Sequence, residues 1–226
     1  MRDPLVLARG ICRSFDDGNE SRLRVLIDVN CRIDAGDRIA VVGVSGSGKT
    51  TLLHILGGLD DPTRGNITWP ALGSQERLRP ASVAFVFQMP SLFPALTVID
   101  NVALPLVLLD STVDASARAE ELLMKLELSK IANMLPDELS GGHAQRAAMA
   151  RALAAGPRLI LADEPTGQLD GATAEHFLDC VMAVIDETGA AFVVATHDET
   201  VAARLETRWS IVAGRLNDDA GSGQDS

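Results

Sequence analysis

The sequence predicts an α/β fold in which a mostly parallel sheet carries an N-terminal antiparallel β subdomain and an inserted helical lobe. Short apolar runs without alternation are typical of strands buried on both faces of a parallel sheet. Four such runs occur, at residues 39–42, 83–87, 159–162 and 192–195. Residues 23–33 instead alternate apolar and polar side chains, with Val25, Ile27, Val29, Cys31 and Ile33 on one side. This pattern indicates a half-buried antiparallel strand.

Helical spacing of apolar residues between these runs supports the α/β assignment. The residues that carry this spacing are Leu52, Leu53, Ile55, Leu56 and Leu59, then Leu122, Leu123 and Leu126, then Phe177, Leu178, Val181, Val184 and Ile185. Gly189 is expected to end the last helix. We expect one domain over residues 1–216, with a helical lobe inserted at about 89–155 and a disordered tail at 217–226.

Composition narrows the classes of function. The chain has 226 residues, and 20 Lys and Arg against 31 Asp and Glu give a net charge of −11, which argues against nucleic-acid binding.

The apolar run at 102–109 contains Pro105 and is far shorter than the roughly 20 residues of a membrane span. The N-terminus has no apolar signal core, so a cytoplasmic protein is expected. The three cysteines are interpreted as reduced structural thiols rather than metal or redox groups.

A phosphate-binding loop is predicted at residues 43–50, Gly-Val-Ser-Gly-Ser-Gly-Lys-Thr, between the strand at 39–42 and a helix that begins near Lys49. Its backbone N–H groups and the helix N-terminus would face phosphate oxygens. Lys49 would neutralise the β and γ phosphates, and Thr50 would give an oxygen to Mg²⁺. The alternative is a Gly/Ser-rich turn that caps a helix.

Polar residues follow the other apolar strands. Because the carboxyl ends of parallel strands line the ligand crevice, Asp163 and Glu164 are expected beside the phosphates. Asp163 would hold Mg²⁺ and Glu164 would act as general base on the attacking water. His197 would contact the γ-phosphate or that water, and Gln88 would contact Mg²⁺ or water.

Ser140, Gly141, Gly142 and His143 precede an Ala-rich helix, for which Ser140 is a suitable N-cap. The simpler interpretation is a capped helix. The alternative is a second anion site, which would bind a nucleotide held by another subunit.

In the order and approximate spacing of these motifs, the sequence resembles the ATP-binding-cassette (ABC) ATPases over about residues 5–215. The resemblance implies a P-loop NTPase fold and a head-to-tail dimer, with ATP between the phosphate loop of one subunit and residues 140–143 of the other. The resemblance also implies that Phe15 is the aromatic residue that stacks on adenine, and the alternative for Phe15 is packing in the core. Asp170 would belong to the D-loop of the family. The expected ATP contacts are Phe15, Gly43, Ser45, Gly46, Ser47, Gly48, Lys49, Thr50 and Thr51; the expected Mg²⁺ ligands are Thr50, Gln88 and Asp163.

Residues 57–65, 101–106 and 163–170 look like the branch that contains lipoprotein-releasing, macrolide-exporter and cell-division ATPases. His143 departs from the family's usual Gln, and the segment at 68–81 is shorter than usual. The resemblance implies an ATPase at the cytoplasmic face of the membrane that powers separate permease subunits. The alternatives are a soluble ABC-type ATPase with non-membrane partners and a regulatory scaffold that binds ATP without turnover.

Overall fold

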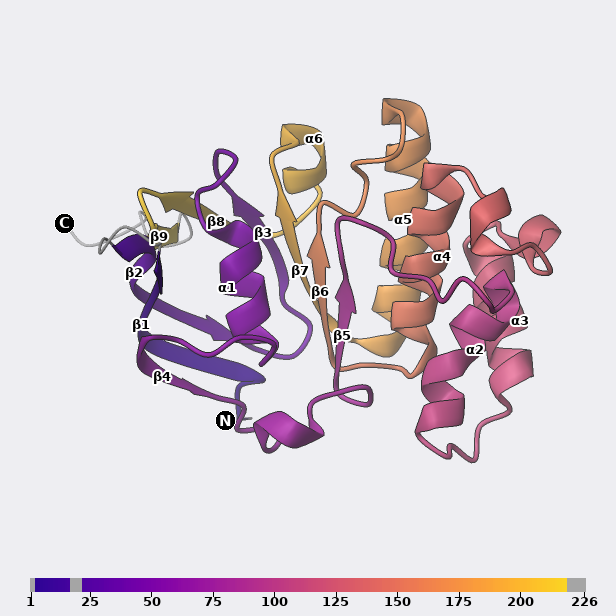
Figure 1. Cartoon of the computed structure of the whole chain (residues 1–226), viewed down its shortest axis with the longest axis horizontal. Helices are drawn as coiled ribbons and strands as arrows, with labels where there is room; N and C mark the ends of the chain where they lie inside the picture. Colours follow the sequence, from indigo (N-terminus) through magenta and orange to yellow (C-terminus); the bar gives the residue numbers. More distant parts are fainter. Residues whose placement is uncertain (1–2, 17–21, 219–226) are drawn as a thin grey trace. The chain divides into compact units, whose positions relative to one another are not determined.

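The computed structural model describes residues 3–16 and 22–218, and the chain divides into two compact units (Figure 1). The first unit comprises Met1–Leu78 and Ala191–Ser226, and the second comprises Arg79–Ala190.

The first unit contains the predicted antiparallel β subdomain. Strand β1 (Val6–Asp16) lies between β2 (Arg22–Ile33) and β4 (Arg64–Thr68), and both pairings are antiparallel. The predicted antiparallel strand at residues 23–33 is therefore confirmed as β2.

The burial pattern of β2 differs from the predicted alternation. Asp28 adopts a positive φ of 54°, and the pairing with β1 shifts register in this region. A bulge of this kind inserts a residue and changes which side chains face the core. Leu26 and Val29 are buried, three positions apart, whereas Ile27 is only half-buried. The prediction that Ile27 and Val29 share one face is therefore wrong at this bulge.

Buried parallel strands form the other sheet of the first unit. Strand β3 (Arg38–Val42) pairs in parallel with β7 (Ala191–Thr196) and with β8 (Thr207–Val212), and β9 (Arg215–Asp218) pairs antiparallel with β8. Every residue of β7 is buried, as its apolar run predicts. Asn217 and Asp218, expected in a disordered tail, belong to β9; residues 219–226 of that tail lie outside the described residues.

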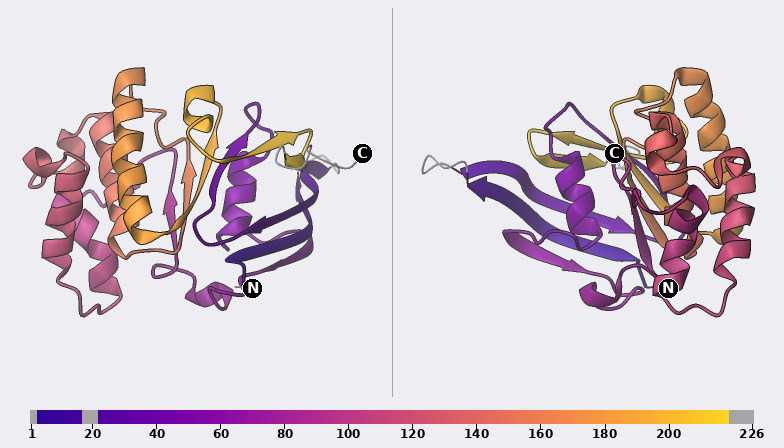
Figure 2. Two further views of the ribbon diagram at one scale, coloured as in Figure 1. Left: turned by 180° about the vertical axis from the view of Figure 1, so that it is seen from behind. Right: turned by 45° about the vertical axis from the view of Figure 1, so that its right-hand side comes forward.

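Helix α1 (Lys49–Leu56) packs against β1 and β2 of the same unit (Figure 2). Its predicted apolar face is buried, but the helix ends before Leu59, which is 41% exposed and outside the core. The buried Trp69 indole N–H donates to the Leu56 carbonyl at 2.7 Å, which satisfies one of the carbonyls left free at the helix end. The short elements of this unit are η1 (Gln75–Arg77) and α6 (Glu199–Ala202).

The second unit contains a parallel strand pair and four α-helices among its described residues. Strand β5 (Val83–Val86) pairs with β6 (Leu159–Asp163), and β6 is buried throughout. The run at 83–87 is not buried on both faces as predicted, because Phe85 is half-buried and Phe87 is exposed, with their rings stacked 5.6 Å apart.

The helices of the second unit are α2 (Val98–Leu108), α3 (Ala115–Lys125), α4 (Gly141–Ala154) and α5 (Gly171–Thr188), with 3-10 turns η2 (Ser129–Ile131) and η3 (Pro136–Glu138). Helices α2, α3 and α4 pack against one another (Figure 1). All three lie within residues 89–155, where the inserted helical lobe is predicted, and the bounds of that lobe stay a prediction. Gly189 ends α5 with φ 66°, as predicted. Across residues 3–16 and 22–218, no helix combines the length and apolar composition that a bilayer crossing requires.

The fully buried amide of Asn101, on α2, fixes the segment that precedes this helix. Its oxygen accepts a hydrogen bond from the Phe93 N–H at 2.7 Å. Its nitrogen contacts three carbonyl oxygens, those of Phe93, Leu96 and Thr97, at 3.0 to 3.1 Å. One side chain therefore holds both backbone groups of Phe93.

Replacing this amide should remove the partner that the side chain supplies to the Phe93 N–H and to the Leu96 carbonyl, and leave a cavity at a fully buried position. We expect Asn101→Ala to lower the free energy of unfolding by about 2 to 4 kcal/mol. Urea unfolding followed by circular dichroism measures the change. Asn133→Ala, at an exposed position of the same unit, is the matched control and should stay within about 0.5 kcal/mol of the parent. Equal effects of the two substitutions would show that the Asn101 network contributes nothing specific.

Candidate functional site

The predicted phosphate loop lies in the first unit, between the end of β3 and the start of α1. Gly48 is the N-cap of α1 and has a φ of 109°, a conformation that favours glycine. A Cβ atom at this position would lie 2.9 Å from the Val25 carbonyl oxygen. The loop therefore depends on glycine here for two reasons, its backbone conformation and the close approach of β2.

The Lys49 ammonium lies inside this loop. Lys49 is only 8% exposed, and its Nζ donates to the carbonyl of Gly43 at 2.8 Å and contacts that of Val44 at 3.4 Å. The Ser47 hydroxyl is also buried and has no hydrogen-bond partner within the described part of the chain. A buried cation, a buried hydroxyl and the N-terminus of α1 make this loop suitable for a polyphosphate.

The remaining phosphate-loop residues predicted to contact ATP are placed as the motif requires. Ser45 and Gly46 are exposed in the turn, and Thr50 and Thr51 lie in the first turn of α1. Thr50 is exposed, and its hydroxyl is the type of oxygen ligand that Mg²⁺ takes.

His197 is brought close to the phosphate loop within the first unit. It follows the last residue of β7, and its side chain is exposed. Together with Gly43 and Val44, it lines a cavity of about 460 Å³. Since β3 and β7 are parallel neighbours, their carboxyl ends meet at one edge, which explains this placement from residues far apart in sequence.

Phe15 lies near the end of β1 and is 40% exposed. The Arg13 guanidinium lies 4.5 Å from the centre of its ring, and Arg13 is itself paired with Asp60 at 2.8 Å. Phe15 is therefore not a core residue, because a side chain packed in the core would be buried rather than 40% exposed. Stacking on adenine stays a prediction.

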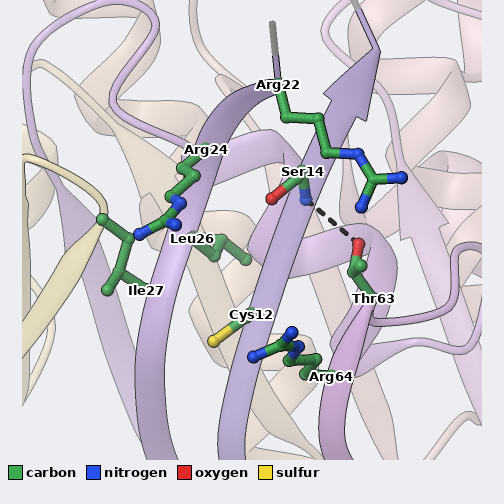
Figure 3. A pocket seen from close by; sticks show the side chains of 8 residues that line it. All are labelled: Cys12, Ser14, Arg22, Arg24, Leu26, Ile27, Thr63 and Arg64. Atoms are coloured by element: carbon green, nitrogen blue, oxygen red, sulfur yellow. Dashed lines mark hydrogen bonds between the residues drawn. The ribbon is translucent and has the colours of Figure 1, made fainter.

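A separate cavity of about 300 Å³ lies on the antiparallel sheet (Figure 3). Cys12 and Ser14 of β1 line it, whereas Arg13 and Phe15 do not, as expected from the alternation of side chains along a strand. Its other lining residues are Arg22, Arg24, Leu26, Ile27, Thr63 and Arg64. This cavity is therefore distinct from the surface that Phe15 offers to a nucleotide.

The second unit carries the predicted carboxylate pair. Asp163 is the last residue of β6 and Glu164 follows it, and each is 9% exposed. Glu164 has a φ of 47°, which is uncommon for a residue other than glycine. A backbone conformation of this kind costs of order 1 to 3 kcal/mol and is typical of functional positions. Gln88 lies two residues beyond the parallel neighbour β5 and is exposed. The structure thus places Gln88 and the two carboxylates at the same edge of the β5–β6 pair.

The residues of the predicted signature begin helix α4. The Ser140 hydroxyl accepts a hydrogen bond from the His143 N–H at 3.2 Å, so its predicted role as N-cap is confirmed. Gly142 packs so closely on the neighbouring turn that an added Cβ would lie 2.6 Å from the Leu169 side chain. The signature and the turn at 168–170, two motifs separated in the sequence, are therefore in contact.

Asp170 has a structural role that the sequence did not predict. Its carboxylate caps α5 by accepting from the N–H of Thr173 at 3.0 Å and from its hydroxyl at 2.8 Å. The Thr173 backbone bond, followed by the hydroxyl bond, lowers the pKa of Asp170. A carboxylate at a helix N-terminus is stabilised in its charged form, so Asp170 is a fixed anion next to the signature.

Two further side chains of α4 hold the segment around Gln88, and sequence reasoning missed both. Gln145 is fully buried, and its Nε2 donates to the Phe87 carbonyl at 3.2 Å. Arg151 donates to the carbonyl and hydroxyl of Ser91 at 2.8 and 2.9 Å, and burial lowers its pKa. A polar residue on an otherwise apolar, Ala-rich helix could have indicated a buried hydrogen bond. The sequence does not indicate its partner, because Phe87 and Ser91 lie 58 and 60 residues away from Gln145 and Arg151.

The comparisons with known proteins agree with this arrangement. Residues 26–167 match the family model described as ABC transporter. The chain is 42% identical over 224 residues to the lipoprotein-releasing system ATP-binding protein LolD of Bordetella pertussis, covering 96% of each chain. It is 42% identical over 214 residues to the protein of the same name from Legionella pneumophila strain Paris, covering 91% of this chain and 94% of the relative.

Among solved structures, the chain is similar to the ATP-binding cassette MJ0796, whose dimer was determined in a post-hydrolysis state bound to ADP and Pi. The TM-score is 0.86 at 36% sequence identity, and the match covers 95% of this chain and 97% of that chain. The fold expected from the sequence, a P-loop NTPase with an antiparallel β subdomain, is thereby confirmed. The chain belongs to the ABC transporter family, and it is an ATPase of that family.

Proposed function

We propose that this chain is the ATP-hydrolysing subunit of a lipoprotein-releasing system and works at the cytoplasmic face of the membrane with separate permease subunits. The observation that carries the proposal is the 42% identity to a protein named for this system, over 96% of both chains. The identity extends over the whole cassette, beyond the residues that match the family model, 26–167.

In this proposal the first unit binds the nucleotide. Lys49 and the backbone N–H groups of the phosphate loop hold the phosphates, and the exposed face of Phe15 stacks on adenine. His197 contacts the γ-phosphate from the cavity that it shares with Gly43. The buried Ser47 hydroxyl donates to a phosphate oxygen, which gives this group the partner it lacks among the described residues.

Thr50, Gln88 and Asp163 are proposed to hold Mg²⁺. A hydroxyl, an amide and a carboxylate supply oxygen ligands, which this cation prefers. When bound, Mg²⁺ neutralises charge on the β and γ phosphates. Glu164 accepts a proton from the attacking water, and burial of this residue restricts its side chain.

Residues 140–143 are proposed to contact ATP held by a second ATPase subunit. Ser140 and the N-terminus of α4 offer a hydroxyl and backbone N–H groups to an anion. The contact of Gly142 with Leu169 means that a shift of the turn at 168–170 moves the signature as well. The dimeric state described for MJ0796 supports this arrangement.

Permease binding is proposed on the segment at residues 89–94. Met89 and Phe93 are 77% and 53% exposed, and Leu92 is half-buried. Asn101 holds the backbone of Phe93, and the Arg151 guanidinium lies 6.0 Å from its ring. An exposed apolar side chain on a fixed backbone is typical of a protein interface.

A charged residue at this position should abolish docking while leaving the ATPase folded. We expect Phe93→Asp to bind ATP like the parent but to lose association with the permease, along with any stimulation of its ATPase activity by the permease. The measurement is a pull-down from detergent-solubilised membranes, paired with circular dichroism. Val113→Asp, at an equally exposed apolar position of the same unit, is the matched control. A folded Phe93→Asp variant that binds at parental strength would exclude this docking segment.

The proposed function itself is tested by copurification and reconstitution. We expect the chain to copurify with an integral membrane permease, and the reconstituted complex to release lipoproteins from proteoliposomes only when ATP is hydrolysed. Copurification with soluble partners alone would favour the non-membrane ATPase. ATP binding without turnover, even with the permease present, would favour the regulatory scaffold.

A further inference from the structure

Three potential metal ligands meet on the surface of the second unit, and none of them is among the residues assigned above to ATP. His176 and Cys180 are one turn apart on α5, so they share a helix face. Other residues of α5, among them Phe177, Leu178 and Val181, are buried in the core. Glu127 follows α3 and is 49 residues earlier than His176 in the sequence, so only the fold brings the three together.

The three ligand atoms are close enough to share one ion. His176 Nε2 lies 3.0 Å from a Glu127 carboxylate oxygen and 4.0 Å from Cys180 Sγ. All three ligand atoms lie within 4.8 Å of one another. In a tetrahedral zinc site the ligand atoms are about 3.4 to 3.6 Å apart, given metal–ligand distances of about 2.0 to 2.3 Å. Small side-chain rotations would therefore complete three corners of a tetrahedron.

The position of Glu127 is fixed by the end of α3. Glu127 has a φ of 58°, and the Leu128 N–H donates to the Leu123 carbonyl at 2.6 Å. This is the helix ending in which glycine is usual, so a glutamate there carries a conformational cost. Lys125 adds a link to α5 through its ion pair with Glu187. The backbone of Glu127 is thus held beside α5, and its carboxylate contacts α5 at His176.

The three potential ligands can be reached from solvent. Cys180 also lines a cavity of about 320 Å³ with Asp179, Ala183, Lys125 and Glu187, to which neither His176 nor Glu127 contributes. His176 and Glu127 are exposed and Cys180 is half-buried, so an ion can reach the three ligands from solvent.

We propose that Glu127, His176 and Cys180 form a binding site for Zn²⁺ or a similar borderline-soft divalent cation, with water as the fourth ligand. One nitrogen, one sulfur and one carboxylate oxygen match the ligand preferences of Zn²⁺ and disfavour Mg²⁺ and Ca²⁺, which take oxygen ligands. The site would join the end of α3 to α5 in addition to the Lys125–Glu187 ion pair. It is distinct in chemistry and in residues from the proposed magnesium site.

Binding at this site exchanges a proton for the metal. Burial first, then the charges of Glu127 and Asp179, raise the pKa of the Cys180 thiol, while Arg146 acts in the opposite direction. The S–H bond breaks as the S–metal bond forms, and the proton passes to solvent.

Cobalt is the probe, because Co²⁺ replaces Zn²⁺ at such sites and a cobalt–thiolate bond absorbs in the near ultraviolet. We expect the chelator-treated full-length chain, without nucleotide, to bind about one Co²⁺ with a thiolate charge-transfer band that Zn²⁺ abolishes. Cys180→Ser should lose this band, and His176→Ala and Glu127→Gln should weaken Zn²⁺ binding about tenfold or more in competition with a chromophoric chelator. Cys31→Ser is the matched control and should keep the band.

Thermal unfolding gives an independent readout. Zn²⁺ at about ten times its dissociation constant should raise the melting temperature of the parent by about 3 to 6 °C and leave that of Cys180→Ser unchanged. The proposal is overturned if the parent shows no thiolate band with Co²⁺, or if Cys180→Ser keeps both the band and the thermal shift. None of these variants touches the phosphate loop, so ATP binding should be equal in all of them.

Discussion

Lys49→Ala is expected to lose ATP affinity by about 100-fold or more, because the variant lacks the ammonium that compensates the β and γ phosphates. Hydrogen bonds to charged groups contribute about 1.5 to 3 kcal/mol each, and Lys49 would make more than one with a triphosphate. The Lys49 ammonium donates to the carbonyl of Gly43 and contacts that of Val44, neutral groups that a phosphate can replace. Isothermal titration calorimetry with ATP measures the change.

Two further variants separate charge from packing. Lys49→Met keeps most of the apolar stem of this buried side chain and should lose affinity as strongly as Lys49→Ala. Lys130→Ala removes an exposed lysine of the second unit and should bind ATP like the parent. An unchanged affinity in folded Lys49→Met would contradict the assignment of residues 43–50 as the phosphate-binding loop.

The phosphate loop was predictable from the sequence because its determinants are local. Gly48 gives the positive φ, and Lys49 begins a helix just beyond the loop that follows a buried strand. The N-cap role of Ser140 and the end of α5 at Gly189 are local in the same way. Local backbone preferences therefore fix the parts of the site that short motifs describe.

Features that depend on distant residues were not predictable. The bulge at Asp28 changes which side chains of β2 are buried, and it depends on the pairing of β2 with β1 rather than on the alternation in β2 itself. Arg151 appears as an ordinary helical arginine until the fold brings Ser91 to it from 60 residues away. Cys180 appears as an isolated thiol for the same reason. Sequence patterns indicate the period of an element, whereas the partners of a polar side chain depend on the tertiary fold.

Glu164→Gln is expected to slow ATP turnover by about 100- to 10,000-fold while ATP binding is retained, because the amide keeps the shape of the side chain but accepts a proton poorly. The substitution changes neither the backbone at residue 164 nor the carboxylate of Asp163, the proposed magnesium ligand. The measurement combines steady-state ATPase rates with ATP affinity. Glu175→Gln, an exposed position on α5, is the matched control and should turn over ATP like the parent.

The same variant tests the proposed sandwich of two subunits. If ATP lies between the phosphate loop of one subunit and residues 140–143 of another, then slow hydrolysis should make the ATP-bound dimer accumulate. Size-exclusion chromatography with light scattering should then show a dimer of Glu164→Gln with ATP and a monomer without it. A second substitution, Lys49→Met, should return this variant to the monomer, because the dimer would be held together by the nucleotide. A Glu164→Gln variant that binds ATP but stays monomeric, alone and with its permease, would contradict the shared site and leave residues 140–143 only their role in capping α4.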